Sequence, residues 1–316
     1  MKTVLVTGSL GLAGSACVEH FNKKGWEVVG IDNNSRAHFF GTEEQMSHEG
    51  RFLSVDIRDE GAVNNLFEME KFDAIVHCAA QPSHDYATDH VLEDFHVNAT
   101  GTLNLLEATR KYCPDAVFVF VSTDKVYGEN MKGEGLSDES LGLDFAGVRS
   151  FFGCSKTAAD MYAQEYAARF GMKVGIFRPG CITGKNHQGV EQHGFLSYLA
   201  KCIKEGIEYK VHGNGKQVRD QVHAKDLAKA FDYFIQNPKA GTVYNIGGGP
   251  DRSVSLLEAV RMLEEKTGKK ANLKYGEPHR KGDRLYDVHD ISKFKKDYPE
   301  FEYTYSLNDI MNELVL

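Results

Sequence analysis

A glycine-rich turn close to the start of the chain restricts the fold more than any other feature. A short apolar run over residues 4–6 predicts a buried strand, and Gly8, Gly11 and Gly14 follow it. A helical pattern comes next, and a second apolar run then ends in Asp32. A strand, a glycine turn, a helix and a second strand that ends in an acid form the layout of a dinucleotide-binding unit.

Each of these residues has a physical task. Gly8 permits a tight turn, and Gly11 lets a pyrophosphate approach a helix N-terminus, where free N–H groups and the helix dipole favour an anion. Gly14 lets the helix pack closely on the sheet, and Asp32 is spaced to bind an adenosine ribose. The spacing is G-x-x-G-x-x-G rather than G-x-G-x-x-G, and in a chain with 31 glycines a packing turn is the alternative. The flanking strand, helix and acid favour the dinucleotide site.

The composition excludes several classes of partner. A net charge of −8 argues against a nucleic acid or an anionic membrane as the main partner. The six cysteines form no C-x-x-C pair, so we expect thiols in a reducing cytoplasm and no metal site. The N-terminus runs directly into a strand, and no apolar run approaches the length of a membrane span. Together these features predict a cytoplasmic protein.

Strands and helices alternate along the first half of the chain. Such alternation predicts an α/β fold with a doubly wound parallel sheet of Rossmann type. Besides the opening unit, strands are predicted at 51–55, 72–77, 116–121 and 173–177, and helices at 60–69, 90–112 and 150–170.

After residue 178 this rhythm breaks, and the second half is predicted to add a smaller lobe. Helices are expected at 195–205, 223–235 and 256–267, and strands at 209–213 and 242–246. The lobe would close over the carboxyl ends of the strands, where ligands bind in open α/β sheets. The predicted division is a Rossmann domain of residues 1–178 and 221–247, and a discontinuous C-terminal substrate lobe of 179–220 and 248–316.

Motifs spread over nearly the whole chain carry a family resemblance. They are TGSLGLAGS from Thr7, HCAAQ from His77, VNATGTLNLLEA from Val97, VSTDKVYG from Val121, FGCSK from Phe152, FRPG from Phe177, GNGKQVRDQVHAKDLA from Gly213, GTVYNIGGG from Gly241 and RKGD from Arg280. Together they resemble the extended short-chain dehydrogenase/reductase family, especially its sugar-nucleotide epimerases and dehydratases. Residues 122–128 and 153–156 look most like the subfamily of CDP-paratose (tyvelose) 2-epimerases.

The resemblance implies a binding site for NAD. The carboxylate of Asp32 would repel a 2′-phosphate and so favour NAD over NADP. Asp56 and Ile57 match the pair that contacts adenine, and residues 79–81 would line the nicotinamide half. The implied cofactor-binding residues are Gly8, Leu10, Gly11, Leu12, Gly14, Asp32, Asn33, Asp56, Ile57, Ala79, Ala80, Gln81, Asn98, Ser122, Lys156 and Pro179.

The same resemblance implies a nucleotide-sugar substrate. Thr123 matches the residue that hydrogen-bonds the reacting hydroxyl, and Lys156 the lysine that binds the nicotinamide ribose and supplies positive potential. The planar guanidinium of an arginine suits the diphosphate of the substrate. The candidate substrate-binding residues are His84, Thr123, His187, Arg219, Arg280 and Asp283.

One position departs from the family pattern. Phe152 stands where the family has the acid/base tyrosine of Tyr-x-x-x-Lys, and a phenyl ring neither accepts nor donates a proton. Three explanations stay open: an engineered Tyr→Phe change, a scaffold that kept its ligands but lost or changed its reaction, or another group in the missing role. Residues 150–151 also depart from the usual pattern, which favours a natural phenylalanine at position 152 over an engineered one. Candidates for that other group are Asp124, Tyr127, Cys154, Cys181 and His187, with plain packing as the alternative for Tyr127 and the two cysteines.

These inferences predict an enzyme, an NAD-dependent nucleotide-sugar epimerase (an isomerase of carbohydrate biosynthesis). It would oxidise a CDP-sugar to a ketosugar and return the hydride to the other face. The alternatives are a nucleotide-sugar dehydratase or oxidoreductase, and a catalytically silent NAD-binding sensor. An acidic pair after Thr123 is usual in a dehydratase, and Asp124 is followed by Lys125 here. The helices at 90–112 and 150–170 carry apolar or small residues over more than one face, which predicts a C2 homodimer.

Overall fold

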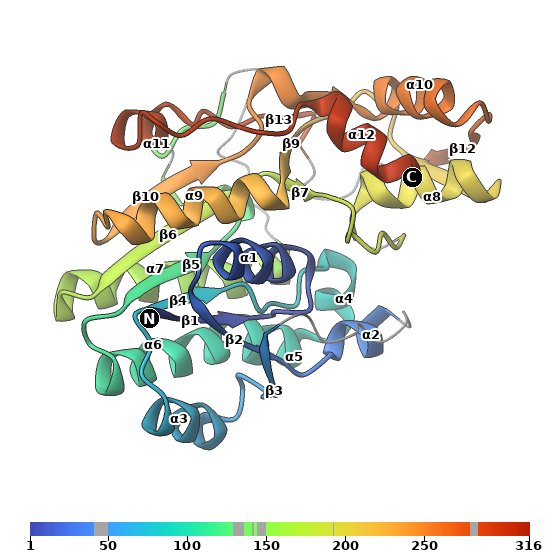
Figure 1. The fold of residues 1–316 in the computed structure, drawn as a ribbon. Coiled ribbons are helices and arrows are strands. Elements are labelled where there is room, and N and C mark those ends of the chain that lie inside the picture. The colour runs from blue at the N-terminus through green and yellow to red at the C-terminus, as the bar shows by residue number, and fades with distance from the viewer. Residues whose placement is uncertain (41–49, 129–135, 141, 144–149, 192, 279–283) are drawn as a thin grey trace.

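A parallel sheet of seven strands forms the centre of the structure (Figure 1). The computed structural model describes residues 1–40, 50–128, 136–140, 142–143, 150–191, 193–278 and 284–316. The seven strands are β1 (Thr3–Thr7), β2 (Glu27–Asp32), β3 (Arg51–Ser54), β4 (Ala74–His77), β5 (Val117–Val121), β6 (Lys173–Pro179) and β10 (Thr242–Ile246). Their order across the sheet is β10-β6-β5-β4-β1-β2-β3, and all neighbours run parallel.

Continuous apolar runs explain why these segments are central strands. Val4, Leu5 and Val6 of β1 are fully buried, and Val4 lies opposite Val28 of β2 and Ala74 of β4. Strands covered on both faces need apolar side chains in both directions, so they show no alternation. The predicted strands are confirmed to within two residues at each end.

Helices account for the remaining regular structure. Among the described residues, none of these helices is both long enough and apolar enough to cross a bilayer. The helices are α1 (Leu12–Lys23), α2 (Ser35–Phe40), α3 (Glu60–Met69), α4 (His84–Asp89), α5 (Val91–Phe95), α6 (Gly101–Tyr112), α7 (Phe151–Phe170), α8 (Phe195–Glu205), α9 (Ala224–Gln236), α10 (Leu256–Thr267), α11 (Ser292–Asp297) and α12 (Leu307–Val315), with a π-helix η1 (His96–Thr100) and the 3₁₀ turns η2 (Asp124–Tyr127) and η3 (Pro250–Arg252).

The helices cover both faces of the sheet (Figure 1). On one face α1 and α9 pack together, and Phe21 and Phe231 join the apolar core beneath them. On the other face α3, α6 and α7 enclose a second core that contains Phe67, Leu105 and Ala163. The predicted doubly wound Rossmann-type sheet is therefore confirmed.

The predicted helix over 90–112 is a run of three segments. Between α5 and α6 the chain adopts the wider π turn of η1. Asn98 lies in this turn, and its amide donates to the Gln81 carbonyl, the Asp94 carboxylate and Ser155 Oγ. Wider turns of this kind are frequent at functional sites.

A second layer of chain lies over the carboxyl ends of the strands. It contains four short strands in the order β11 (Ser253–Ser255), β9 (Val218–His223) and β13 (Tyr286–Asp287), with β7 (Cys181–Thr183) paired to β9. A separate pair joins β8 (Glu208–His212) to β12 (Asn272–Glu277), and α8, α10 and α12 enclose a third core. Only β8 among these strands was predicted.

The predicted division into a Rossmann domain and a substrate lobe stays a prediction. Part of the tail assigned to the lobe packs against the large sheet. Phe294 of α11 contacts Phe177 of β6 and Tyr244 of β10, and Phe301 belongs to the same core. The last sixty residues thus contribute to both layers.

A buried ion pair ties α7 to the sheet. Both Nε and Nη2 of Arg178, on β6, donate to the Asp160 carboxylate of α7, at 3.0 and 2.7 Å. Ser122 Oγ, just beyond β5, donates to the same carboxylate at 2.5 Å. Burial alone would lower the pKa of Arg178, but its hydrogen bonds to Asp160 raise it. The pair fixes the ends of two strands against the helix that carries Phe152 and Lys156.

We expect Arg178→Met to lower the free energy of unfolding by about 3–5 kcal/mol, because it leaves a buried carboxylate without its cation. Urea unfolding followed by circular dichroism measures the change. The matched control is Arg169→Met, which removes an ion pair to Glu165 from a side chain that is 75% exposed. That change should cost less than about 1 kcal/mol. Equal losses in both variants would contradict a structural role for the buried pair.

Candidate functional site

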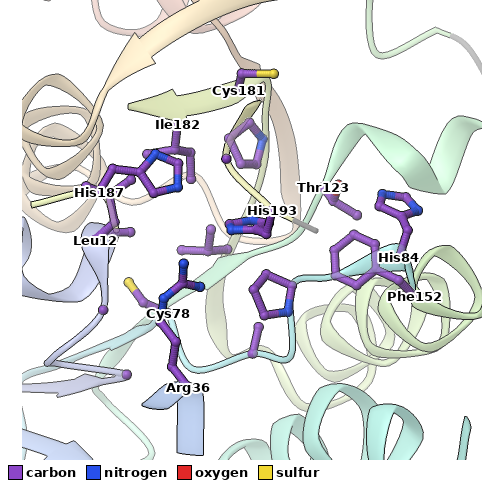
Figure 2. A pocket seen from close by; sticks show the side chains of 18 of the residues that line it. Leu12, Arg36, Cys78, His84, Thr123, Phe152, Cys181, Ile182, His187 and His193 are labelled. Atoms are coloured by element: carbon purple, nitrogen blue, oxygen red, sulfur yellow. The ribbon is translucent and has the colours of Figure 1, made fainter. Parts of the chain in front are cut away.

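A large cavity lies at the carboxyl ends of the parallel strands. Its volume is about 780 Å³, and residues of both layers line it (Figure 2). The turns and loops that follow β1 to β6 all contribute, which is where an open parallel sheet places its ligands. Predicted site residues on its wall are Gly8, Gly11, Leu12, Gly14, Asp32, Asn33, Asp56, Ile57, Ala79, Ala80, His84, Ser122, Thr123, Phe152, Lys156, Pro179, Cys181, His187 and Arg219.

The glycine turn forms a cradle of bare backbone at one end of the cavity. Gly8 has φ +64°, and a Cβ there would lie 2.7 Å from the backbone of Ala79. A Cβ on Gly14 would lie 2.0 Å from the Gly8 carbonyl oxygen, so α1 can start this close to β1 only without a side chain. The first N–H groups of α1 have no acceptor within the helix and meet the cavity wall at Leu12 and Ala13. This arrangement suits a phosphate bridge.

Acidic residues define the far end of this cradle. The Asp32 carboxylate accepts backbone N–H groups from Leu10, at 3.1 Å, and Asn34, at 2.8 Å. Asn33 donates its side-chain amide to Asp56 at 2.9 Å. Partial burial favours the neutral acid, but hydrogen bonds from Arg58 hold the pKa of Asp56 below its usual value. Two oriented carboxylates are thus available for the hydroxyl and amino groups of an adenosine.

Thr123 and Lys156 lie on the cavity wall near the carboxyl end of β5. The Lys156 ammonium donates to the Val121 carbonyl at 2.7 Å and sits 4.3 Å from the centroid of the Phe120 ring. Burial lowers the pKa of Lys156 to about 8, although Asp160 opposes the shift. Thr123 Oγ1 accepts the Lys125 N–H and donates to Asp124, both at 3.2 Å. These side chains provide a cation and a hydroxyl at the cavity wall.

Phe152 lies on α7, one turn before Lys156, at the position where the family has its tyrosine. Its ring is buried and meets the imidazole of His84 edge to face, with ring centroids 4.9 Å apart and an angle of 62° between the planes. Figure 2 shows the two rings next to each other, with Thr123 on the same side of the cavity. The predicted contact His84 therefore lies beside the position where the family places its tyrosine.

A buried cluster of charges lines the upper wall of the cavity, and sequence reasoning singled out only Arg219 and Asp124 among its members. Lys125 Nζ bridges Asp124, at 2.8 Å, and Asp287, at 2.9 Å, and Arg284 also donates to both carboxylates. Arg219 Nε lies 4.0 Å from Asp287. These residues are far apart in the sequence, so no local motif signals the cluster.

A second buried pair completes this upper wall. The imidazole of His289 lies 3.0 Å from the Asp220 carboxylate. Burial would lower the pKa of His289, but Asp220 raises it to about 9. Asp124, Asp287 and His289 are close enough together to resemble metal ligands. Because Lys125 and Arg284 already neutralise the two carboxylates, a divalent cation would have to displace both of them.

Several predicted residues lie away from the cavity wall. Leu10 contributes its backbone N–H to Asp32, while Gln81 and Asn98 are fully buried in one hydrogen-bond network behind the wall. Tyr127 is fully buried and donates to Asn245 at 2.7 Å. Cys154 is exposed on α7 and does not line the cavity. Arg280 and Asp283 lie outside the described residues.

The two remaining candidates for the missing acid/base role, Cys181 and His187, have strongly shifted pKa values. Burial raises the pKa of the Cys181 thiol to about 12, so it stays protonated. Burial and the nearby Arg36 lower the pKa of His187 to about 3, so its ring stays neutral. Neither ring nitrogen of His187 meets solvent or a hydrogen-bond partner among the described residues.

Comparison with known proteins identifies the family. A profile described as "NAD dependent epimerase/dehydratase family" matches residues 4–247. The chain belongs to this family. It is 34% identical over 286 residues to CDP-paratose 2-epimerase of Salmonella typhi, covering 83% of each chain, and 30% identical over 272 residues to dTDP-D-glucose 4,6-dehydratase of Homo sapiens, covering 84% of this chain and 75% of the relative. The crystal structure of UDP-glucose 4-epimerase with UDP-glucose from Thermotoga maritima superposes with a TM-score of 0.88 at 28% identity, covering 99% of this chain and 97% of that one.

Membership of this NAD-dependent epimerase/dehydratase family agrees with the wall of the cavity. The predicted cofactor, NAD, is the cofactor of the family. The side-chain-free cradle at Gly8 and Gly14 fits a diphosphate, and Asp32 fits the ribose beside it. Epimerases and dehydratases of nucleotide sugars both occur among the relatives, so the family alone leaves the reaction undecided.

The buried His187 predicts a specific dependence of stability on pH. The native ring stays neutral down to about pH 3, whereas an unfolded histidine binds a proton below about pH 6.5. The unfolded state therefore binds the extra proton, and stability falls as the pH decreases from 6.5. We expect His187→Gln to reduce the loss of stability between pH 7 and pH 5 by about 2 kcal/mol.

Urea unfolding at the two pH values checks this expectation. The control is His90→Gln, which changes an exposed histidine of the α4–α5 junction that does not line the cavity. An identical pH dependence in the wild type and in His187→Gln would contradict a neutral, buried ring.

Proposed function

We propose that this chain is an epimerase of a CDP-linked deoxyhexose that acts by transient oxidation. A sugar hydroxyl is oxidised to a ketone, the ketosugar turns in the cavity, and reduction on its other face inverts the carbon. The observation that carries the proposal is the meeting of the cofactor cradle with Thr123 and Lys156 in one cavity. The 34% identity to CDP-paratose 2-epimerase supports both the reaction and the nucleotide.

Lys156 and Thr123 have different roles in the proposed reaction. Bound NAD supplies a reversible hydride acceptor for the sugar carbon. Lys156 holds positive potential beside that carbon and, while charged, favours the build-up of negative charge on the sugar oxygen. The hydroxyl of Thr123 orients the reacting hydroxyl of the sugar by a hydrogen bond. Since the hydride returns to the substrate, no net oxidant is consumed, and the cofactor is expected to stay bound.

Arg219 is the proposed anchor for the substrate diphosphate. It lines the cavity from β9, and with Lys125 and Arg284 it belongs to a cluster in which the cations outnumber the two carboxylates. A guanidinium offers planar, paired donors to phosphate oxygens. Arg280 and Asp283, which the family resemblance also assigns to the substrate nucleotide, are proposed as additional contacts.

A homodimer remains part of the proposal. Leu92 and Phe95 on α5 and Tyr162 on α7 are exposed by 74%, 48% and 53%, and these two helices pack against each other. Large exposed apolar side chains on two packed helices are typical of an interface. Light scattering at micromolar concentration should give twice the mass of the chain, and a monomer would contradict the dimer.

A dehydratase is the second candidate, because a dehydratase is among the relatives at 30% identity. Elimination of water requires an acid that protonates the leaving hydroxyl. Asp124 follows Thr123 directly, but Lys125 and Arg284 both bind its carboxylate oxygens, which are then not directed at a sugar hydroxyl. The pairing therefore argues against Asp124 as that acid and for epimerisation.

Incubation with nucleotide sugars in deuterated water, followed by NMR of the products, tests the proposal. We expect an epimerised CDP-deoxyhexose with no deuterium from solvent, because the hydride returns from the cofactor. Incorporation of deuterium would indicate elimination or enolisation and favour the dehydratase. Tight NAD binding without any turnover would support a silent sensor instead.

Thr123→Val keeps the shape of the side chain and removes its hydroxyl, so we expect kcat to fall about 10²-fold. NAD affinity, measured by calorimetry, should not change. A variant with the kcat of the wild type would remove Thr123 from the proposed site.

A further inference from the structure

Oxidation of a carbinol releases a hydride and a proton, and each needs its own acceptor. The C–H bond breaks and its electron pair leaves with the hydrogen as hydride, while the O–H bond breaks and its proton needs a base. On the return step the ketone oxygen takes a proton back. Phe152 cannot accept or donate this proton, although its ring is buried in the cavity wall one turn before Lys156. This inference rests on the proposed function.

Most titratable groups near Thr123 are held in hydrogen bonds or ion pairs, or stay protonated, which makes them poor candidates for the base. The Lys156 ammonium is bound to the Val121 carbonyl, and with a pKa of about 8 it is mainly charged at neutral pH. Asp124 is held by Lys125 and Arg284, and Cys181 stays a thiol. Tyr127 is bonded to Asn245 away from the cavity wall.

His84 differs from these groups in its position. It is the first residue of α4, a helix that packs against α7, and its side chain is half-buried on the cavity wall. The edge-to-face contact with Phe152, with centroids 4.9 Å apart, holds the imidazole against the ring at the position where the family has its tyrosine. An imidazole exchanges a proton near neutral pH more readily than any other side chain.

We infer that His84 is the acid/base residue of this enzyme. In the oxidation step a ring nitrogen accepts the proton of the sugar hydroxyl, while the hydride goes to the cofactor. In the reduction step the imidazolium returns that proton to the ketone oxygen as the hydride comes back, so atoms and electrons balance over the cycle. Phe152 supplies the apolar surface that orients the ring.

The test begins with His84→Asn, which keeps a polar side chain but removes the proton acceptor. We expect kcat to fall by about 10²–10⁴-fold, the usual contribution of a general base. Affinities for NAD and for the CDP-sugar, measured by calorimetry, should stay within about threefold of the wild type, well below the tenfold change that 1.4 kcal/mol would cause. His90→Asn, an exposed histidine just beyond the other end of α4, is the matched control and should keep the wild-type kcat.

A second variant distinguishes proton transfer from packing. Placing a tyrosine hydroxyl at the neighbouring position, in the double variant His84→Asn/Phe152→Tyr, should recover at least about tenfold of the lost kcat, because a new acid/base group then stands in the same region. A loss caused by altered packing would not be rescued by this change. NMR of histidine ring protons adds a readout independent of turnover: the CDP-sugar should shift the His84 signal and leave the His90 signal in place.

The outcomes distinguish failure of the role of His84 from failure of the proposed epimerase function. Turnover in the wild type with an unimpaired His84→Asn overturns the role of His84 and leaves the epimerase standing. Loss of CDP-sugar affinity in His84→Asn, without rescue in the double variant, makes His84 a binding residue and also overturns the assignment. No turnover by the wild type with any nucleotide sugar refutes the proposed function, and the acid/base role with it.

Discussion

The close approach of three backbone segments at the start of the sheet is the constraint on which the site depends. The end of β1, the first turn of α1 and the segment after β4 meet at Gly8 and Gly14, where a Cβ would lie 2.7 Å or less from a backbone atom. With no side chain between them, the N–H groups at the start of α1 open directly into the cavity. These N–H groups would hold the diphosphate of NAD, and Asp32 would bind its adenosine ribose. Thr123, just beyond the end of β5, and Lys156 line the same cavity as this cradle.

Buried polar networks keep the other walls of the cavity in position. The pair of Arg178 and Asp160 holds α7 to the strands β5 and β6, and the cluster around Asp287 holds the upper wall. A buried charge without a partner would destabilise the fold, so these groups occur in hydrogen-bonded pairs. The pairing has a chemical consequence, because a carboxylate or ammonium fixed by its partner is poorly suited to exchange protons with a ligand. The half-buried imidazole of His84 lies in edge-to-face contact with Phe152.

Much of the fold followed from hydrophobic periodicity. Helices α3, α8 and α10 end at the predicted residues, and α7 begins one residue after the predicted start, where Ser150 caps it. Long periodic segments are predictable because one face must pack on the sheet whatever the rest of the chain does. Strand β9 was missed for the opposite reason. Its residues Arg219, Asp220, Gln221 and His223 are polar and buried, and their partners come from distant parts of the chain.

The sequence by itself determined the glycine turn and the acid of the proposed cofactor end of the site. Three glycines and Asp32 lie within one short β-α-β segment, so their spacing alone sets the geometry that a dinucleotide requires. Only the tertiary structure decided which polar side chains line the cavity. It places Tyr127 against Asn245, 118 residues away, and brings the ring of His84 onto Phe152. The physical reason is that backbone geometry depends on neighbouring residues, whereas the exposure of a side chain depends on segments that fold over it from elsewhere in the chain.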